Sequence, residues 1–500
     1  MFDFIIQGFG VALTPLNLGL AFSGALLGTL FGALPGIGPI NGIAILMPLA
    51  YTLGLPAESA LILLAGIYTG AEYGGRMSSI LLNVPGDAGA VMTTLDGYPL
   101  AKRGLAGPAL GISAISSFVG ASIAILGLTL FAPLLATVAV QFGPAELFTM
   151  MVFAFASMSV MMGNDPVKTA LGAILGVLIG TVGVDSGTGI QRFTFDIPDL
   201  YDGIDFVVLI IGMFAISEIL LMLESRLQHG KSGALPVIGR VFVTMKEILY
   251  CKGAMLRSGL LGFLIGVLPG TGASVAGAVS YTTEKRVSDK DNTFGTGDMR
   301  GLAAPEAANN ASAAGSFVPM LTLGIPGSGT TAVLLGALML YNITPGPMMF
   351  SELPKVAGGL IASLYIGNIV LLLLNLPLAG FFARVLTIPR WALVPGIVIL
   401  SFVGVYQLHS DMGAIYLMLG IGVLGYLLRK LNFSLATIVL GFVLGGLMEE
   451  NLRRALAISG GDSSILWQSG ISQGLWLASL LLLLGPFLLS RLGKRKAQTA

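Results

Sequence analysis

Apolar stretches of membrane-spanning length, separated by short polar or glycine- and proline-rich segments, follow one another along the whole chain. About fifteen can be distinguished, from residues 14–34 to residues 470–490. A helix needs roughly 20 mainly apolar residues to cross a bilayer, and several of these stretches are too short or too interrupted to do so. The pattern therefore predicts an all-α polytopic membrane protein with about 10–12 transmembrane crossings and additional re-entrant hairpins.

The composition supports a membrane protein and excludes several other classes. Of the 500 residues, 55% are hydrophobic and 10% are charged, whereas a soluble domain has about 25% charged residues. The formal net charge of +1 argues against nucleic acid as a partner. The lone Cys251 excludes an internal disulfide and a multi-cysteine metal site, and the sequence contains no HExxH motif.

Lysine and arginine are concentrated in a few segments, which we expect on the cytoplasmic side. The longest lies within residues 226–257, and we interpret 226–252 as a cytoplasmic linker between a first membrane repeat (1–225) and a second (253–500). The loop at residues 185–205 holds five aspartates and one arginine, so it should face the opposite side. The other basic positions expected in the cytoplasm are Lys102–Arg103, Arg384, Arg390, Arg429–Lys430 and the tail 491–496.

Two proline-glycine breaks occur twice, once in each half of the chain. LLGTLFGALPGIG (26–38) is matched by LLGFLIGVLPGTG (260–272), and NVPGDAGA (83–90) is matched by GIPGSGTT (324–331). Further along each half, Asp165 and Asp411 each open an apolar helix after a polar turn. Because the charge pattern places the start of the two halves on opposite sides, we predict two inverted-topology repeats with broken helices.

Matched helix breaks near the middle of a bilayer are typical of secondary transporters. A half-helix N-terminus presents free N–H groups and a partial positive charge to an anion, and freed carbonyl groups can coordinate Na⁺. The simpler alternative is that these glycines and prolines only kink ordinary membrane helices.

Candidate binding residues lie at or directly after the breaks, where hydroxyl, carboxamide and backbone N–H groups suit a carboxylate. A possible Na⁺ site is assigned to Asn309 and Gly324. The predicted substrate-binding residues are Pro35, Gly36, Gly38, Asn41, Asn83, Pro85, Gly86, Gly270, Thr271, Gly272, Asn310, Pro326, Gly327, Ser328, Thr330 and Thr331.

Ionisable residues near the breaks have both a functional and a structural interpretation. Glu72, Arg76, Asp87 and Glu306 are functional candidates because charged groups are costly inside a membrane, but Arg76 has the i,i+4 spacing for a structural ion pair with Glu72. The stretch GTGD (295–298) matches a signature of intramembrane aspartyl proteases. It lies in a polar segment without a partner motif, so we expect an exposed loop there.

Several long runs resemble the large membrane subunit of the tripartite tricarboxylate transporters, the TctA-like family. They are GIYTGAEYGGRMSSILLNVPG (66–86), TTLDGYPLAKRGLAGPAL (93–110), GLAAPEAANNASAAGSFVPMLTLGIPGSGTTAVLLGAL (301–338) and LMEENLRRAL (447–456), together with the two LPG breaks. The resemblance implies a multi-pass protein of the bacterial inner membrane. It further implies a small four-helix membrane subunit and a periplasmic solute-binding protein as partners, and uptake driven by Na⁺ or H⁺ without another cofactor.

We therefore expect a secondary transporter subunit that imports a citrate-like di- or tricarboxylate, and no enzymatic activity. A passive anion channel is an alternative, although a channel would more often show rings of pore-lining charge. A membrane-embedded enzyme is a second alternative, but no nucleophile, base or metal constellation is visible in the sequence.

Overall fold

A computed structural model describes residues 3–161, 165–185, 187–228, 243–386 and 390–498. Its helices in the first part of the chain are α1 (Asp3–Ala12), α2 (Pro15–Ala33), α3 (Gly38–Thr52), α4 (Ala57–Leu82), α5 (Thr93–Leu100), α6 (Ala106–Ala139), α7 (Pro144–Met161), α8 (Pro166–Gly180), α9 (Phe206–Ile210) and α10 (Ser217–Gln228). Short π-helical segments, η1 (Ala101–Leu105) and η3 (Ile211–Ile216), join α5 to α6 and α9 to α10.

The second part continues with thirteen further described helices. They are α11 (Met245–Gly266), α12 (Gly272–Ser288), α13 (Met299–Gly315), α14 (Phe317–Leu323), α15 (Gly329–Leu340), α16 (Met349–Glu352), α17 (Pro354–Asn375), α18 (Ala379–Val385), α19 (Val394–His409), α20 (Met412–Lys430), α21 (Leu435–Ile458), α22 (Ile465–Gln468) and α23 (Gly470–Gln498). Two 3₁₀ turns, η2 (Pro198–Leu200) and η4 (Arg390–Leu393), complete the helical elements. Strands β1 (Gly183–Val184) and β2 (Gln191–Arg192) form a small antiparallel hairpin.

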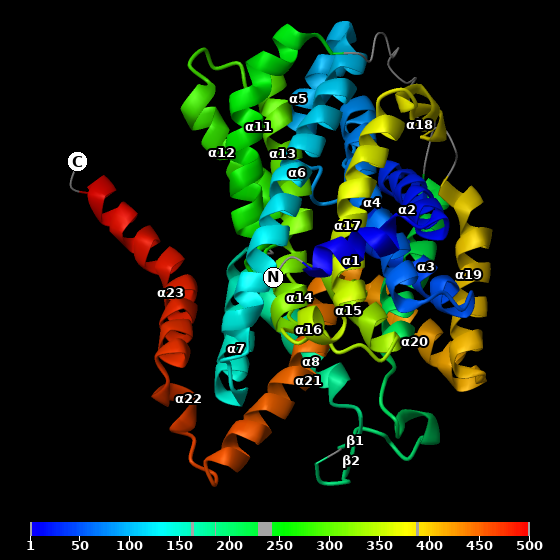
Figure 1. Ribbon diagram of the computed structural model, residues 1–500, viewed down its shortest axis with the longest axis vertical. Helices are drawn as coiled ribbons and strands as arrows, with labels where there is room; N and C mark the ends of the chain where they lie inside the picture. Colours follow the sequence, from blue (N-terminus) through cyan, green and yellow to red (C-terminus); the bar gives the residue numbers. More distant parts are fainter. Residues whose placement is uncertain (1–2, 162–164, 186, 229–242, 387–389, 499–500) are drawn as a thin grey trace.

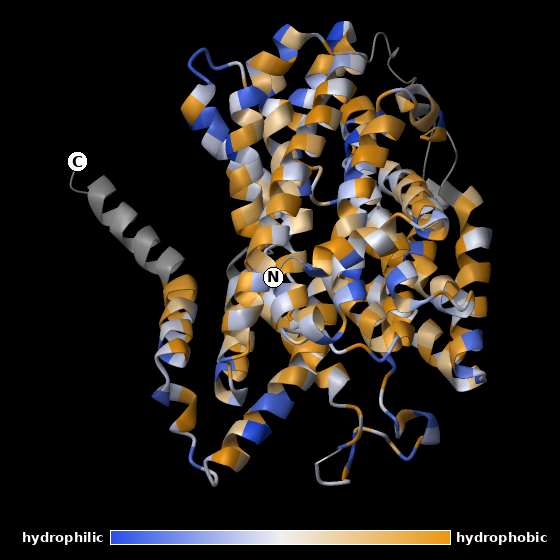
Figure 2. Cartoon of the chain, viewed as in Figure 1, coloured by the Kyte–Doolittle hydropathy of each residue, from blue (hydrophilic) through white to orange (hydrophobic). Residues whose placement is uncertain are grey.

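The described helices confirm an almost entirely α-helical membrane protein. Seven of them are long and apolar enough to cross a bilayer, and six more are apolar but shorter. In Figure 2, hydrophobic colours cover most of the length of the helices, while hydrophilic colours are prominent at the outer ends of α12 and α21. The total of about 10–12 crossings stays a prediction, because the shorter helices do not reach the length of a full span.

The basic and acidic segments lie toward opposite ends of the molecule, as the charge pattern predicts. Figure 1 shows α18 and the start of α11 at one end of the long axis, and the β1–β2 hairpin and the end of α21 at the other. Asp185 beside the hairpin pairs with Arg453 of α21 at 2.9 Å. Hydrogen bonds from the Thr188 hydroxyl and the Gly187 N–H, with this arginine, lower the pKa of Asp185 to about 2. The acidic loop is thereby attached to α21.

Helix starts follow ordinary capping chemistry. Asp165 caps α8 by accepting hydrogen bonds from the N–H groups of Val167 and Lys168, and Asp411 caps α20 by accepting one from Ala414. The prediction that these two aspartates open apolar helices is therefore confirmed.

The division of the chain into two repeats and a linker stays a prediction, and residues 229–242 of the predicted linker lie outside the described residues.

Glycines allow the closest helix pairs to meet backbone to backbone. A Cβ added at Gly28 or Gly32 of α2 would lie 2.3 Å or 2.0 Å from a carbonyl oxygen of α4. At the matching positions of α11, a Cβ at Gly262 or Gly266 would lie 2.4 Å from a carbonyl oxygen of α13. Only glycine permits this approach, which is a common way of packing helices in membranes.

Both LPG segments interrupt the chain between helices rather than kinking a continuous helix. Helix α2 ends at Ala33 and α3 begins at Gly38, just as α11 ends at Gly266 and α12 begins at Gly272. The matched pairs Gly36/Gly270 and Gly38/Gly272 all adopt positive φ angles, a conformation that suits glycine. The explanation by simple kinks is therefore wrong at these positions.

The GTGD stretch has a structural role that explains its glycines. The carboxylate of Asp96 in α5 accepts hydrogen bonds from the N–H groups of Gly295 (2.9 Å), Gly297 (2.8 Å) and Asp298 (2.8 Å), and from the Tyr281 hydroxyl (2.9 Å). Asp298 in turn caps α13. The segment is thus a loop wrapped around a buried carboxylate from the first half of the chain.

We expect Asp96→Ala to destabilise the protein, because it leaves several buried donors without an acceptor. An unsatisfied buried group costs about 1–3 kcal/mol, so the thermal unfolding midpoint in detergent should fall by several degrees. Asp96→Asn keeps one acceptor oxygen and should have a smaller effect. The control is Asp202→Ala, at an exposed loop position. Equal midpoints for Asp96→Ala and this control would contradict the structural role of the loop.

Candidate functional site

The four helix breaks surround one interior cavity of about 520 Å³. Its wall combines the loop after α2, the loop after α4, the start of α12 and the start of α15. The lining residues are Gly36, Ile37, Gly38, Pro39, Ile40, Asn41, Tyr68, Glu72, Pro85, Gly86, Asp87, Ala88, Gly89, Phe214, Gly272, Ala273, Ser274, Ser328, Gly329, Thr330, Arg429, Ser434 and Ala436. Segments far apart in sequence thus meet at a single site.

The two breaks of the first half are joined through their backbones. The Gly36 N–H donates to the Gly86 carbonyl at 3.2 Å, and the Gly86 N–H donates to the Gly75 carbonyl of α4 at 3.2 Å. Asn41 supports the first loop from α3, because its carboxamide donates to the carbonyls of Ile37 and Gly36. The Asn41 Oδ1 atom is buried and accepts no hydrogen bond.

A capping box orders the break before α15. The Ser328 hydroxyl accepts from the Thr331 N–H at 3.2 Å, and the Thr331 hydroxyl accepts from the Ser328 N–H at 2.8 Å. The Tyr68 hydroxyl of α4 lies 3.3 Å from the Ser328 hydroxyl and 3.3 Å from the Ser316 hydroxyl. Thr331 is therefore occupied in the cap, while Ser328 and Thr330 face the cavity.

The break between α11 and α12 is fixed from two sides. The Thr271 hydroxyl donates to the Ile265 carbonyl at 2.7 Å, and Ser157 of α7 donates to the Pro269 carbonyl at 2.6 Å. A Cβ at Gly270 would lie 2.2 Å from the side chain of Met158. Thr271 and Gly270 therefore shape the loop, and Gly272 and Ser274 reach the cavity.

The predicted substrate residues divide into those that line the cavity and those that support it. The first group is Gly36, Gly38, Asn41, Pro85, Gly86, Gly272, Ser328 and Thr330. The second group, which does not line it, is Pro35, Asn83, Gly270, Thr271, Asn310, Pro326, Gly327 and Thr331. Asn83 and Gly324 are left-handed C-caps of α4 and α14, and the Asn310 carboxamide donates to the Glu306 carbonyl of its own helix.

The two residues assigned to a Na⁺ site have different surroundings. Asn309 is 1% exposed and lies against the second loop, where a Cβ at Gly89 would be 2.4 Å from the Asn309 Oδ1. Gly324 instead faces Pro345, whose carbonyl oxygen would lie 2.7 Å from a Cβ at Gly324. These contacts provide no common site for the two residues.

Arg429 is a cavity residue that sequence reasoning missed. It lies near the end of α20 and forms an ion pair with Glu218 of α10. A Cβ at Gly36 would lie 3.2 Å from Glu218 Oε1, which places this pair beside the first break. In the sequence, Arg429 is one of two basic residues at the end of an apolar helix, a pattern that indicates orientation in the membrane and not a cavity residue.

The buried ionisable residues do not pair as the i,i+4 spacing suggests. Arg76 donates to the Ser117 hydroxyl of α6 at 3.1 Å, and Ser117 donates to Glu306 of α13 at 3.0 Å. The guanidinium also lies 4.6 Å from the centre of the Tyr73 ring. The considered Arg76–Glu72 ion pair is therefore wrong, since Arg76 is directed toward Glu306.

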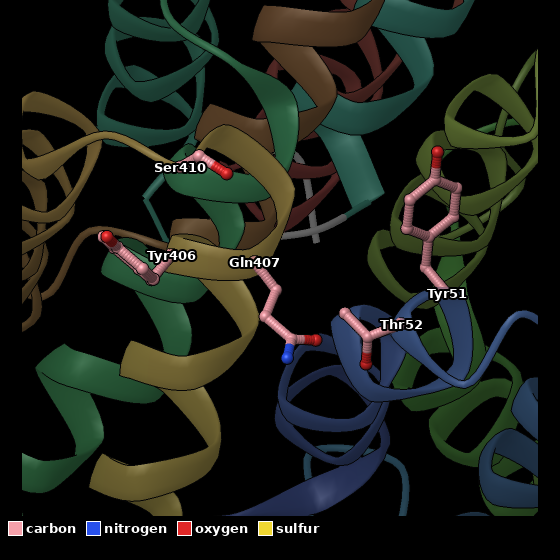
Figure 3. Close-up of a pocket in the computed structure, with 5 residues that line it drawn as sticks. All are labelled: Tyr51, Thr52, Tyr406, Gln407 and Ser410. Carbon is pink, nitrogen blue, oxygen red and sulfur yellow. The ribbon is translucent and has the colours of Figure 1, made fainter.

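A second cavity, of about 400 Å³, opens between the end of α3 and the end of α19. Figure 3 shows Thr52 and Gln407 on facing helices, with Ser410 beyond them. It is lined by Tyr51, Thr52, Tyr406, Gln407 and Ser410. None of the predicted substrate or ion residues lies there, so the cavity at the four breaks is the candidate site.

Interrupted apolar helices around one shared cavity define a multi-pass membrane protein. The pattern of the Tripartite tricarboxylate transporter TctA family matches residues 18–440. The chain belongs to this family, and it is a transporter component rather than an enzyme. A tripartite transporter has partner subunits, in agreement with the resemblance seen in the sequence.

Two proteins of Agrobacterium vitis are similar to the chain. One, described as an uncharacterized 52.8 kDa protein in the TAR-I ttuC' 3' region, is 42% identical over 469 residues, covering 94% of this chain and 92% of the relative. The other, an uncharacterized protein in the TAR-II ttuC' 3' region, is 44% identical over 233 residues, covering 46% of this chain and 96% of the relative. No solved structure matches the chain.

We expect Gly86→Ala to disrupt the candidate site. The new Cβ would lie 2.4 Å from the Gly32 carbonyl oxygen and 2.5 Å from the Gly75 Cα, and these backbone atoms cannot move independently. Overpacking of this kind costs about 1–3 kcal/mol, measured as a lower thermal unfolding midpoint. Gly367→Ala in α17 is the matched control, because nothing lies within 4 Å of its added Cβ. An unchanged midpoint for Gly86→Ala would contradict the close packing of the second break against α2 and α4.

Proposed function

We propose that this chain imports a citrate-like di- or tricarboxylate across the bacterial inner membrane, driven by a Na⁺ or H⁺ gradient. A periplasmic solute-binding protein delivers the substrate, and a small four-helix membrane subunit completes the transporter. The observation that supports this proposal most is the convergence of all four helix breaks on one cavity of about 520 Å³.

Three helix starts give part of the cavity wall the electrostatics of an anion site. Helices α3, α12 and α15 begin at Gly38, Gly272 and Gly329, all of which line the cavity. Each helix start contributes N–H groups and a partial positive charge of roughly half an elementary charge. These groups bind a carboxylate without a buried lysine, whose desolvation is costly in a membrane.

Arg429 adds a full positive charge to the same cavity and forms an ion pair with Glu218. In the proposed cycle, a substrate carboxylate takes the place of Glu218 on the guanidinium. Arginine is suited to this exchange, because its planar group donates two parallel hydrogen bonds to a carboxylate.

Two features support inverted-topology repeats with re-entrant segments. The pairs α2–α4 and α11–α13 pack through glycines at matching positions, and the matching break residues share positive φ angles. In the proposed mechanism, the helices that carry the breaks move together relative to the long apolar helices. Alternating access around a central site is the usual use of such repeats.

We expect Arg429→Gln to reduce carboxylate uptake at least tenfold. A hydrogen bond to a charged group contributes about 1.5–3 kcal/mol, and 1.4 kcal/mol corresponds to about a tenfold change in affinity. Uptake of radiolabelled citrate is measured in proteoliposomes with the partner subunits, under a Na⁺ gradient and then under a proton gradient. Accumulation against the citrate gradient distinguishes a transporter from a passive channel.

Two variants make this experiment interpretable. Arg429→Gln combined with Glu218→Gln removes both charges of the ion pair, so it tests binding without changing the net charge at this place. Arg454→Gln is the control, because this arginine is 64% exposed and pairs with Glu450 on its own helix. Citrate uptake at the wild-type level by the double variant would refute the role of Arg429.

A further inference from the structure

Two acidic residues line the cavity that we propose binds an anion, although their negative charges would oppose such binding. Glu72 of α4 and Asp87 of the following loop both face the cavity. Asn309 of α13 lies beside the Glu72 carboxylate and against Gly89. Because Glu72 is 4% exposed and Asn309 is 1% exposed, these polar groups are almost completely removed from solvent.

Four polar atoms of these three side chains are buried without a hydrogen-bond partner. Glu72 Oε2, Asp87 Oδ2 and both polar atoms of Asn309 are buried without a hydrogen bond. The other oxygen of Asp87 accepts from the Ala90 N–H at 2.9 Å. Three acceptor oxygens are thus left unsatisfied, two on residues that line the cavity and one on Asn309, which does not line it, although most buried polar groups in proteins are paired.

Within the described part of the chain, neither carboxylate forms an ion pair with a basic side chain, because Arg429 in the same cavity pairs with Glu218. Arg76, on the same helix as Glu72, is directed to Glu306 through Ser117. Thr93 donates a further hydrogen bond to Glu306. Arg76 is therefore directed to a third acid and Arg429 to Glu218, so neither arginine pairs with Glu72 or Asp87.

We propose that Glu72, Asp87 and Asn309 form a binding site for a monovalent cation, Na⁺, that couples to carboxylate binding. This inference rests on the proposed function and assigns its coupling ion. One bound Na⁺ satisfies oxygens from all three side chains, whereas one proton satisfies at most two of them.

The proposed cation also explains how acids are compatible with an anion site. Without Na⁺, Glu72 and Asp87 repel an incoming carboxylate in the same cavity. Bound Na⁺ cancels part of that repulsion, so the affinity for the carboxylate rises, and by thermodynamic reciprocity the carboxylate raises the affinity for Na⁺.

Two glycines leave room for the proposed ligand oxygens. A Cβ at Gly75 would lie 2.6 Å from Asp87 Oδ2, and a Cβ at Gly89 would lie 2.4 Å from Asn309 Oδ1. Gly89→Ala therefore displaces Asn309 without changing any ligand residue, and it offers an independent test of the site.

The test is thermal unfolding of the purified full chain, with NaCl titrated against choline chloride at constant ionic strength and without substrate. A ligand that binds only the folded state raises the unfolding midpoint in a saturable way. We expect a saturable increase for the wild type. Asp87→Asn, Glu72→Gln and Gly89→Ala should need at least tenfold more Na⁺ for the same increase. Asp202→Asn, an exposed loop aspartate, should behave as the wild type does.

The first two substitutions conserve side-chain volume, so loss of the Na⁺ response with an unchanged midpoint in choline chloride separates lost binding from misfolding. A wild type that does not respond to Na⁺, or variants that respond as the wild type does, would overturn the site. So would a midpoint that depends on pH and not on Na⁺, or one raised only by CaCl₂.

The citrate experiment separates this inference from the proposed function. Accumulation of citrate by a protein without a Na⁺ response refutes the cation site and leaves carboxylate transport standing. An Asp87-dependent Na⁺ response without accumulation of any carboxylate refutes the transport function and leaves the cation site standing.

Discussion

Every backbone group that leaves a helix inside a bilayer must find a partner within the protein, and this requirement organises the centre of the molecule. The Gly36 N–H reaches the Gly86 carbonyl, and the Gly86 N–H reaches the Gly75 carbonyl. The first break is thus satisfied by the second, and the second by the helix that precedes it. Since the first break depends on the second, these two breaks lie together rather than at separate places in the membrane.

The close helix pairs follow from the same requirement. Loops that exchange backbone hydrogen bonds need their helices at short distance, and glycines at 28 and 32 bring α2 onto the carbonyls of α4. Gly262 and Gly266 do the same for α11 on α13. Without water to drive apolar burial, contact between helices in lipid depends on such small residues. The many glycines are therefore used for packing as well as for turns.

The positions of the breaks could be predicted from the sequence, because proline and glycine act locally on the backbone. The direction of each side chain could not. The Thr271 hydroxyl donates to the carbonyl of Ile265, and this partner depends on the conformation of its own loop. Arg76 selects Ser117 and Glu306 over Glu72, because a neighbouring helix supplies a competing partner.

Arg429 is a second example of a side chain whose contacts local sequence does not predict. An arginine at the end of an apolar helix has the pattern of an orientation signal, and only the packing of α20 beside α10 brings it to the first break. Local sequence therefore predicts where the chain leaves its helices, while long-range packing decides which charges meet there.

Charges of both signs line one cavity, and together they determine how the proposed transport cycle binds and releases the carboxylate. A site made only of helix starts and Arg429 would hold a carboxylate strongly on either side of the membrane, and release would limit the rate. The carboxylates of Glu72 and Asp87 weaken that hold whenever no cation accompanies them. Once the cation leaves, these acids repel the bound carboxylate and promote its release. Because release then follows departure of the cation, an ion gradient can set the direction of the cycle.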